Sequence, residues 1–394
     1  MGRKGNKPGN QVPLKNTASI PITPEKFGLE QALSHHLDTL SLQDQSPRLS
    51  KKESEYVPHT NTSSFTNTAS ASPYLSDDFE EETHNVKPQE TLLEIVSTPD
   101  RGLAVFTTRK IKAGTLLLAE KPLVRLQKHE EDDPEAIERE FSLLSRPDQK
   151  VFLKLFDAQK SRMTRVVSIY YSNCYNCDSY VASGRGGSAM GVFASRVNHS
   201  CVPNVQFCYD ERSNEMRFHA IRDIPRGKEL CSNYDKAVFE VKSKRQRKQQ
   251  IYYGFICRCE ACEPKNEFWT RSDERRRAMY DAFRTVQGCE KELSTQGRRS
   301  LEDGLAQTVP MPTVDEALGA LVKLEDLLLK ECLAGVPLAN TYRSLAKWAE
   351  RKRDHAQAVK WKGKELEVCR LSFGSDALRT KGVEEKLIEL CEGC

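Results

Sequence analysis

The amino-acid sequence predicts an α+β protein in which a β-rich domain precedes an all-helical one. Two segments that share the pattern R-x-I-x-x-G, residues 109–114 and 222–227, lie between apolar runs. This pattern is typical of a strand, a tight turn and a strand, so we expect a small β core of short hairpins. Residues 130–170 change to a helical spacing of apolar side chains, and the chain after Cys262 is helical to its end.

The composition divides the chain into four expected parts. Residues 1–88 are rich in Ser, Thr, Asn, Pro and Lys and lack a sustained apolar period. Such a segment cannot bury enough surface to offset its conformational entropy, so we expect a disordered tail. An amphipathic stretch at 27–40 could become helical on a partner, but a solvated tail is the favoured interpretation. The β-rich domain is expected over residues 89–240, a short cysteine-containing segment over 241–264 and the all-helical domain over 265–394.

The β-rich domain should begin near Thr91, where the apolar run at 92–96 predicts a strand. Its helical insert, expected over about residues 130–170, carries regularly spaced apolar side chains and is interrupted by Pro147.

Two capping boxes mark helices in the C-terminal part. Thr313 with Glu316 is expected to open one helix, and Asp354 with Gln357 another, which should end at Gly374. Small residues favour close pairing of these helices, although no repeat is regular enough to identify an array.

Composition and charge exclude several classes of protein. The chain has 394 residues, 38% of them hydrophobic and 29% charged, which suits two domains or so with a real core. A net charge of +4 does not by itself indicate a nucleic-acid partner. No apolar run approaches the roughly twenty residues of a membrane span. The thirteen cysteines are odd in number and mostly without paired spacings. We therefore expect a soluble protein of the cytoplasm, the nucleus or both, without membrane contact.

Four cysteines have the pattern of a metal site. Cys257, Cys259 and Cys262 form a C-x-C-x-x-C cluster, and Cys201 stands earlier in the run N-H-S-C-V-P-N. Three thiolates packed this tightly can close around Zn²⁺ only if a fourth soft ligand arrives from elsewhere, and four-cysteine sites are structural. The sequence predicts a structural zinc site with Cys201 as the fourth ligand.

These cysteines stand in a series of motifs that resembles a known family. The motifs are D-R-G-L-A-V-F at 100–106, N-H-S-C-V-P-N at 198–204, E-L-C-S-N-Y at 229–234, and Y-G-F-I-C-R-C-E-A-C at 253–262. In this order they resemble a SET domain with its zinc-binding post-SET segment. The arrangement is most similar to the SET and MYND branch of protein-lysine methyltransferases and to related fungal SET proteins.

The resemblance also concerns the parts around these motifs. Because no cysteine precedes Cys174, the MYND finger of that branch is expected to be absent. The paired helices of residues 265–394 resemble the tetratricopeptide-like tail of the same family, and this domain is a candidate surface for a protein partner.

The resemblance implies an S-adenosylmethionine-dependent protein-lysine N-methyltransferase acting on a histone or another protein. Methyl transfer to an amine is an in-line displacement, so positioning supplies most of the rate. An apolar channel would also favour the neutral form of the substrate lysine. The resemblance assigns Tyr234 and Tyr253 as the catalytic residues, which line the channel of the substrate lysine. It assigns cofactor binding to Arg101, Gly102, Leu103, Asn173, Asn198, His199, Tyr234 and Phe255.

The alternative is a non-catalytic SET-fold scaffold for protein interaction. Asp100 stands where the family has the first glycine of a cofactor turn, which favours the scaffold, as does the irregular insert. The intact Asn198-His199 pair and the two tyrosines oppose it.

Three further patterns have plain interpretations. The C-x-x-C of Cys174 and Cys177 is a weak signal for zinc or redox chemistry, and unligated thiols are favoured. Residues 183–188 lack the Lys-Ser/Thr ending of a phosphate loop, which favours a linker. The basic run 242–248 could serve nuclear import or phosphate contact, but a solvated helix face is favoured. It lacks interleaved aromatic residues, which argues against nucleic-acid binding.

Overall fold

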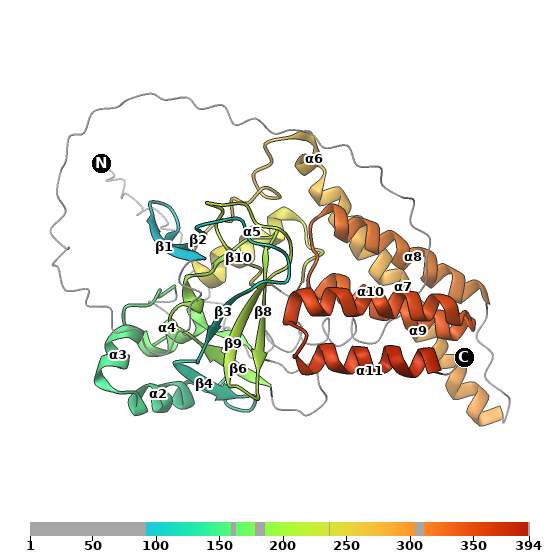
Figure 1. The fold of residues 1–394 in the computed structure, drawn as a ribbon, viewed down its shortest axis with the longest axis horizontal. Coiled ribbons are helices and arrows are strands. Elements are labelled where there is room, and N and C mark those ends of the chain that lie inside the picture. The colour runs from blue at the N-terminus through green and yellow to red at the C-terminus, as the bar shows by residue number, and fades with distance from the viewer. Residues whose placement is uncertain (1–91, 159–162, 178–185, 236, 304–310, 393–394) are drawn as a thin grey trace, which may run out of the picture.

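The structure is a computed structural model that describes residues 92–158, 163–177, 186–235, 237–303 and 311–392. The expected tail over 1–88, with the amphipathic stretch at 27–40, lies outside the described residues. Figure 1 shows the strands and the short helices of the insert on one side of the molecule and the long helices α7 to α11 on the other.

Among the described residues the strands form four small sheets. An antiparallel hairpin consists of β1 (Leu93–Thr98) and β2 (Gly102–Thr107). One three-stranded sheet has the order β3 (Leu116–Glu120), β9 (Glu215–Ala220) and β8 (Val205–Asp210). The other has the order β4 (Val124–Gln127), β6 (Gly187–Met190) and β5 (Tyr175–Asn176). A short parallel pair is formed by β7 (Asn198–His199) and β10 (Cys231–Ser232), and the 3₁₀ helix η1 (Ala194–Arg196) lies directly before β7.

The two R-x-I-x-x-G turns pair with each other. Ile111 and Ile224 exchange backbone hydrogen bonds of 2.9 Å in both directions. Gly114 and Gly227 have φ angles of 83° and 70°, the left-handed region that glycine tolerates best. The expectation of a local hairpin at each turn is wrong, because β2 pairs with β1 while β3 pairs with β9. The turns instead connect different sheets.

Three helices lie between β4 and β5: α2 (Pro134–Leu143), α3 (Arg146–Phe152) and α4 (Arg165–Asn173). Pro147 lies in the first turn of α3, where its missing N–H costs nothing, so it helps to begin a helix. Ile137, Phe152 and Tyr170 are fully buried in one apolar cluster with the inner face of β4 and β6. The insert therefore packs on this sheet as a small separate core.

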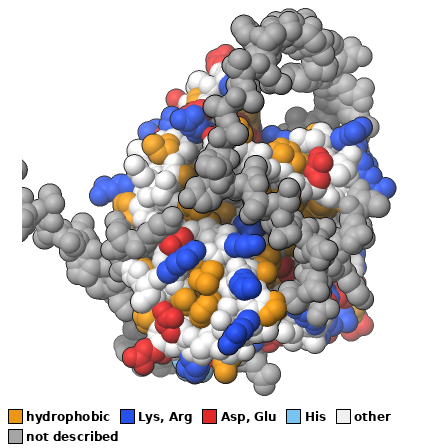
Figure 2. All heavy atoms as spheres, turned by 90° about the vertical axis from the view of Figure 1, so that its left-hand side faces the viewer, with side chains coloured by type: hydrophobic (Ala, Val, Ile, Leu, Met, Phe, Trp, Pro, Cys, Tyr) orange, Lys and Arg blue, Asp and Glu red, His pale blue; other side chains and the backbone are white. Residues whose placement is uncertain are grey.

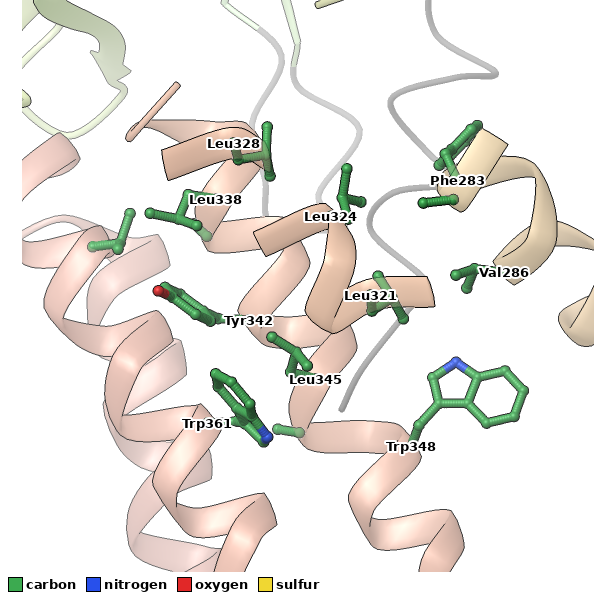
Figure 3. Packing of buried hydrophobic residues seen from close by; sticks show 14 of the residues in the cluster. Phe283, Val286, Leu321, Leu324, Leu328, Leu338, Tyr342, Leu345, Trp348 and Trp361 are labelled. Atoms are coloured by element: carbon green, nitrogen blue, oxygen red, sulfur yellow. The ribbon is translucent and has the colours of Figure 1, made fainter. Parts of the chain in front are cut away.

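The chain continues as helices after β10. These are α5 (Lys242–Tyr253), α6 (Glu267–Thr270), α7 (Ser272–Asp303), α8 (Met311–Lys330), α9 (Val336–Lys352), α10 (His355–Phe373) and α11 (Leu378–Glu392). From α7 onward each helix packs against the next. Figure 3 shows their shared core, in which Tyr342 and Trp361 stack with ring centroids 5.6 Å apart.

One of the two predicted helix caps is confirmed and the other is wrong. The Asp354 side chain accepts a hydrogen bond from the backbone N–H of Gln357, and the helix that it opens ends at Gly374. Thr313, by contrast, lies inside α8, which has already begun at Met311. Its hydroxyl donates to Glu292 of α7 at 3.2 Å, so a tertiary partner uses the group that the cap would need.

The strands and the helical domain share buried surface. Val238, which precedes α5, belongs to the core cluster of the long helices, with Phe239 and Cys208 packed against it. On the same junction, Arg217 of β9 forms an ion pair of 2.9 Å with Asp376, which lies between α10 and α11. In the described parts of the chain, no helix is both long and apolar enough to cross a bilayer.

Candidate active site and metal centre

The four predicted metal ligands meet in space. The Sγ atoms of Cys201, Cys257, Cys259 and Cys262 all lie within 4.8 Å of one another. Cys201 Sγ is 3.8 Å from Cys257 Sγ and 3.7 Å from Cys262 Sγ. A tetrahedral zinc with bonds of about 2.3 Å holds its sulfur atoms roughly 3.8 Å apart. The four thiols therefore fit a single tetrahedral zinc ion.

Local turns place these cysteines. Helix α5 ends at Gly254 in the left-handed conformation, which directs the chain away from the helix axis. The carbonyl of Cys259 accepts hydrogen bonds from the N–H groups of Cys262 and Glu263, both at 2.8 Å. This tight turn brings the last two thiols to the same side, while Cys201 arrives from the loop after β7.

A buried arginine lies beside the thiols. Arg245 of α5 has its Nη2 atom 3.6 Å from Cys262 Sγ and donates to the carbonyl of Ala261 at 3.2 Å. Burial alone would lower the pKa of Arg245, but Cys201 and Cys262 raise it. Hydrogen bonds among the four thiols lower the pKa of Cys259 and raise that of Cys201. Metal binding requires the four thiols as thiolates, and the buried guanidinium of Arg245 would then neutralise part of their negative charge.

The position of Arg245 corrects one expectation about the basic run 242–248. Lys244 and Arg247 are exposed, as a solvated helix face requires, whereas Arg245 is buried against the cysteines. Part of this positive charge is therefore structural.

His199 connects the cysteine centre to Tyr234. Its Nε2 atom lies 3.4 Å from Cys201 Sγ, and its Nδ1 atom accepts a hydrogen bond of 3.1 Å from the backbone N–H of Tyr234. Burial lowers the pKa of His199 to about 3, so the ring is neutral. Because Nδ1 is an acceptor, this network assigns the ring hydrogen to Nε2, which faces the sulfur.

Aromatic rings surround Tyr234. Its ring centroid lies 4.9 Å from that of Tyr253 and 5.2 Å from that of His199, while Phe255 lies 6.0 Å from His199 and 6.4 Å from Tyr253. The Tyr234 hydroxyl donates to the carbonyl of Val197 at 3.0 Å. Burial, with the neighbouring Tyr175 and Tyr253, raises the pKa of Tyr234 well above its usual value. The phenol is therefore neutral at physiological pH.

A polar network borders this aromatic group. Arg101 forms an ion pair of 3.0 Å with Glu229 and donates to the carbonyl of His199 at 2.8 Å. Asn198 donates to Glu229 at 2.9 Å and to the carbonyl of Leu103 at 3.3 Å. Burial alone would lower the pKa of Arg101, but Cys231 and Glu229 raise it.

Glu229 is the residue of this network that the sequence analysis does not single out. It holds both Arg101 and Asn198 in place. It stands within the E-L-C-S-N-Y motif, and an acidic residue there is the signal that could have identified it.

The turn before β2 is open on the side of Gly102. Gly102 has a φ angle of 66°, and a Cβ at this position would meet nothing within 4 Å. Glycine is thus required here for its backbone conformation rather than for tight packing. Asp100 is exposed in the same turn.

Asn173 is the predicted site residue that the structure does not join to the others by a contact. Its Nδ2 atom donates to the carbonyls of Phe156 and Ile169, at 2.8 and 2.7 Å, both within the helical insert. Both amide hydrogens therefore stabilise the end of α4, and only the Oδ1 oxygen could meet a cofactor without displacing one of these bonds.

The other singled-out cysteines take no part in the four-thiol cluster. Cys174 is half-buried and Cys177 is buried, and neither forms a disulfide within the described residues. Residues 183–185 of the glycine-rich stretch lie outside the described residues.

The chain is similar to known proteins. The SET domain family model matches residues 102–235, so the chain contains a SET domain. The histone-lysine N-methyltransferase set5 of Schizosaccharomyces pombe is 32% identical over 200 residues, which cover 50% of this chain and 59% of that protein. The human protein-lysine N-trimethyltransferase SMYD5 is 33% identical over 78 residues, 19% of each chain. The matched region is thus less than two thirds of either relative.

Among solved structures, the Neurospora SET domain protein DIM-5, a histone lysine methyltransferase, is 23% identical with a TM-score of 0.23, covering 36% of this chain and 52% of that one.

Proposed function

We propose that this chain is an S-adenosylmethionine-dependent protein-lysine N-methyltransferase. The observation that carries the proposal is the direct connection between the aromatic group around Tyr234 and the polar network of Arg101, Asn198 and Glu229, through His199. The matched SET domain and its relatives named as lysine methyltransferases support it.

The polar network is suited to hold the amino-acid part of the cofactor. Glu229 orients the guanidinium of Arg101 and the amide of Asn198. The open side of Gly102 permits a close approach to the backbone there. Phe255 supplies an aromatic face for the adenine. Asn173 would contact the cofactor through its Oδ1 oxygen, because its amide hydrogens are engaged within the insert.

The tyrosines are suited to hold the substrate lysine. S-adenosylmethionine, when bound, supplies the electrophilic methyl group. The faces of Tyr234 and Tyr253 attract a cationic side chain through their π electrons, and their apolar surroundings favour the neutral amine that can attack. The neutral hydroxyl of Tyr234 gives a fixed hydrogen-bonding group that can align this amine. The substrate is a histone or another protein with an accessible lysine, in the cytoplasm, the nucleus or both.

We assign the four cysteines to one structural zinc ion. The ligand set is closed, with four buried or nearly buried thiols and a counter-charge from Arg245, so the ion would hold the segment of Phe255 against β7 and take no part in the reaction. Nucleic acid is not an expected partner. Arg245 is unavailable to it, and on the face in Figure 2 basic side chains are interspersed with acidic and hydrophobic ones. A flat salt titration with DNA or RNA is the expected result.

Transfer of a tritiated methyl group to a proteome extract tests activity and substrate class together. With an extract whose own enzymes have been inactivated by heat, we expect labelled protein bands with the wild-type chain and none with cofactor alone. The rival scaffold, which Asp100 favours, predicts no label and no rise in melting temperature when S-adenosylmethionine is added. A cofactor-dependent rise without transfer would indicate a binding protein rather than an enzyme.

A further inference from the structure

A second buried arginine reaches the cysteine centre, and it comes from the helical domain. Arg276 of α7 is fully buried. Its Nη2 atom donates to the carbonyl of Cys201 at 2.9 Å, and its Nη1 atom donates to the carbonyl of Val238. A side chain of the long helices thus holds the backbone of a predicted metal ligand that lies 75 residues earlier in the chain.

The end of helix α8 neutralises this arginine. Glu331, also fully buried, pairs with Arg276 Nε at 2.9 Å and with Arg275 at 2.6 Å, and it accepts a hydrogen bond of 2.7 Å from Ser272. The first turn of α7 and the end of α8 are therefore fixed at one point. Loss of one partner of a buried ion pair strongly destabilises a protein, because the other charge is left buried without a counter-charge. A displacement of α7 relative to α8 that separates these groups would have the same effect.

The same turn of α7 also holds the first arginine. Asp273 accepts a hydrogen bond of 2.7 Å from the backbone N–H of Lys242 and lies 3.4 Å from Arg245 Nη1. Arg245 in turn faces Cys262 Sγ at 3.6 Å. Four thiolates around one Zn²⁺ carry a net charge of −2, and the guanidinium of Arg245 brings the opposite charge close to them, while Arg276 holds the backbone of Cys201. Outer groups of this kind tune metal affinity as well as orient ligands.

The contacts continue from the cysteine centre to the proposed reaction site. Cys201 touches His199 at 3.4 Å, and His199 accepts the backbone N–H of Tyr234 at 3.1 Å. A continuous series of bonds therefore runs from Glu331 through Arg276, Cys201 and His199 to Tyr234.

We propose that Arg276 couples the helical domain to the metal centre, so that metal binding and docking of the helices stabilise each other. Arg276 is thus a positioning residue, which acts on Tyr234 through Cys201 and His199. The inference rests on the zinc assigned above but not on methyl transfer. Coupling of this kind is reciprocal. The free energy by which the metal stabilises helix docking equals the free energy by which docking stabilises metal binding.

The helical domain contains a matched ion pair away from the cysteines. Arg343 of α9 pairs with Glu365 of α10 at 2.9 Å, and the carboxylate is fully buried. Its loss should weaken the helical domain without touching Cys201, so Arg343→Gln is the control for Arg276→Gln.

The first experiment compares metal retention in full-length proteins. A chromophoric zinc chelator is titrated into wild type, Arg276→Gln and Arg343→Gln at equal concentration. We expect Arg276→Gln to release its zinc at about tenfold lower chelator concentration, the lower end of the usual effect of outer-sphere changes, and Arg343→Gln to match wild type. Equal retention in all three, or equal loss in both variants, overturns the coupling. If Arg276→Gln does not fold, Arg276→Lys, which keeps the charge but not the guanidinium fork, replaces it.

The second experiment needs no variant. Hydrogen exchange of the wild-type protein is measured with zinc and after its removal by chelator. We expect removal to increase exchange in residues 272–279 and 327–333, around the Arg276–Glu331 pair, and around Tyr234, but less in residues 355–373 of α10. Unchanged protection at 272–279 overturns the proposal. Purified protein without zinc would refute the metal assignment and this inference together, while leaving the methyl-transfer test unaffected.

Discussion

Tyr234 is fixed by three different kinds of contact. His199 accepts its backbone N–H, Tyr253 packs on its ring, and the carbonyl of Val197 accepts its hydroxyl hydrogen. A side chain held in this way costs little further entropy to align a substrate. Its hydroxyl is therefore the atom on which the proposed activity can be tested most directly.

Tyr234→Phe is expected to lower methyl transfer at least tenfold, about 1.4 kcal/mol of transition-state stabilisation. Binding of S-adenosylmethionine should change less, because Arg101, Asn198 and Phe255 remain. The matched control is Tyr342→Phe, which removes a buried hydroxyl hydrogen bond to Glu325 in the helical domain. It should lower the melting temperature but leave turnover unchanged. Wild-type turnover in a stably folded Tyr234→Phe protein contradicts the catalytic role.

Glu229→Gln tests the polar network. The amide keeps the shape of the side chain but loses the charge that pairs with Arg101, so we expect cofactor affinity to fall about fivefold, on the order of 1 kcal/mol. Calorimetric titration with S-adenosylmethionine measures it. Glu215→Gln, which breaks the similar pair with Arg217 on β9, is the control and should bind the cofactor normally. Unchanged affinity in the Glu229 variant would leave its carboxylate with a purely structural role.

At the scale of elements, the cysteine segment after α5 is too short and too polar to hold its position by apolar burial alone. Its small cluster contains the four metal-site cysteines, Val202 and Ala261, with few large side chains. In segments of this kind a structural zinc supplies the missing folding free energy.

Cys259→Ser is therefore expected to remove zinc and to lower the thermal stability of the whole protein. Apparent binding free energies of structural zinc in small peptides are roughly 10–16 kcal/mol, so a loss should be obvious in metal analysis and in the melting curve. Cys177→Ser, at a buried cysteine outside the four-thiol cluster, should keep its zinc. Full zinc content in the Cys259 variant would disprove the ligand assignment.

The junction between β9 and α10 contains a buried histidine. His219 lies against Gly374 at the end of α10 and near Cys208 of β8, with Arg217 and Asp376 as the neighbouring charges. Burial, and then Arg217, lowers the pKa of His219 to about 4. In the unfolded chain its pKa is about 6.5, so between these values the unfolded chain binds a proton that the folded protein does not.

Stability should therefore fall as the pH decreases through this window. Between pH 7 and pH 5 we expect His219 to account for a loss of about 2 kcal/mol. His219→Gln should show a correspondingly smaller change in unfolding free energy over the same range, measured by urea titration. An identical pH dependence in the two proteins would show that the imidazole stays hydrated or keeps its proton.

The elements that sequence reasoning predicted correctly depend on local signals. The cap at Asp354 and the helix end at Gly374 involve neighbouring residues, so their pattern is visible in the chain. The turns at 109–114 and 222–227 were recognised as turns, but their pairing with each other depends on sheet topology. Thr313 failed as a cap because its hydroxyl is used by Glu292 of a different helix, a contact that no local pattern reveals.

At the scale of the whole molecule, two cores share one junction. Val238, from the segment that joins the SET domain to α5, is buried among the long helices, and Arg276 reaches back to Cys201. Further along the junction, Arg217 and Asp376 pair at 2.9 Å. The helical domain therefore completes the SET domain rather than following it as an independent unit.

The candidate site was predictable where its residues occur in ordered motifs, as the meeting of the four cysteines shows. Contacts between distant segments were not predictable. The role of Arg276 depends on a carbonyl 75 residues away, and Asn173 turns to the helical insert because two carbonyls there accept its amide hydrogens. Arg245 was counted with a solvated basic face because one sequence cannot show which side of a polar helix is buried.

Two truncations test this view of the whole molecule. Deletion of residues 1–85 should leave the melting temperature and cofactor binding unchanged, because that segment lacks a pattern that could form a core. Deletion of residues 265–394 should lower the melting temperature by at least about 4 °C, roughly 1–2 kcal/mol for a domain of the remaining size. It removes the cover of Val238 and the hydrogen bond from Arg276 to Cys201.

Calorimetry on the two truncated proteins and the full chain distinguishes the alternatives. A SET segment that melts at the full-chain temperature without its helices would show that the domains are independent. A large loss of stability on removing residues 1–85 would mean that this segment belongs to the fold. The expected result is asymmetric, since the C-terminal helices contribute buried charge and apolar surface to the cysteine centre and its neighbours.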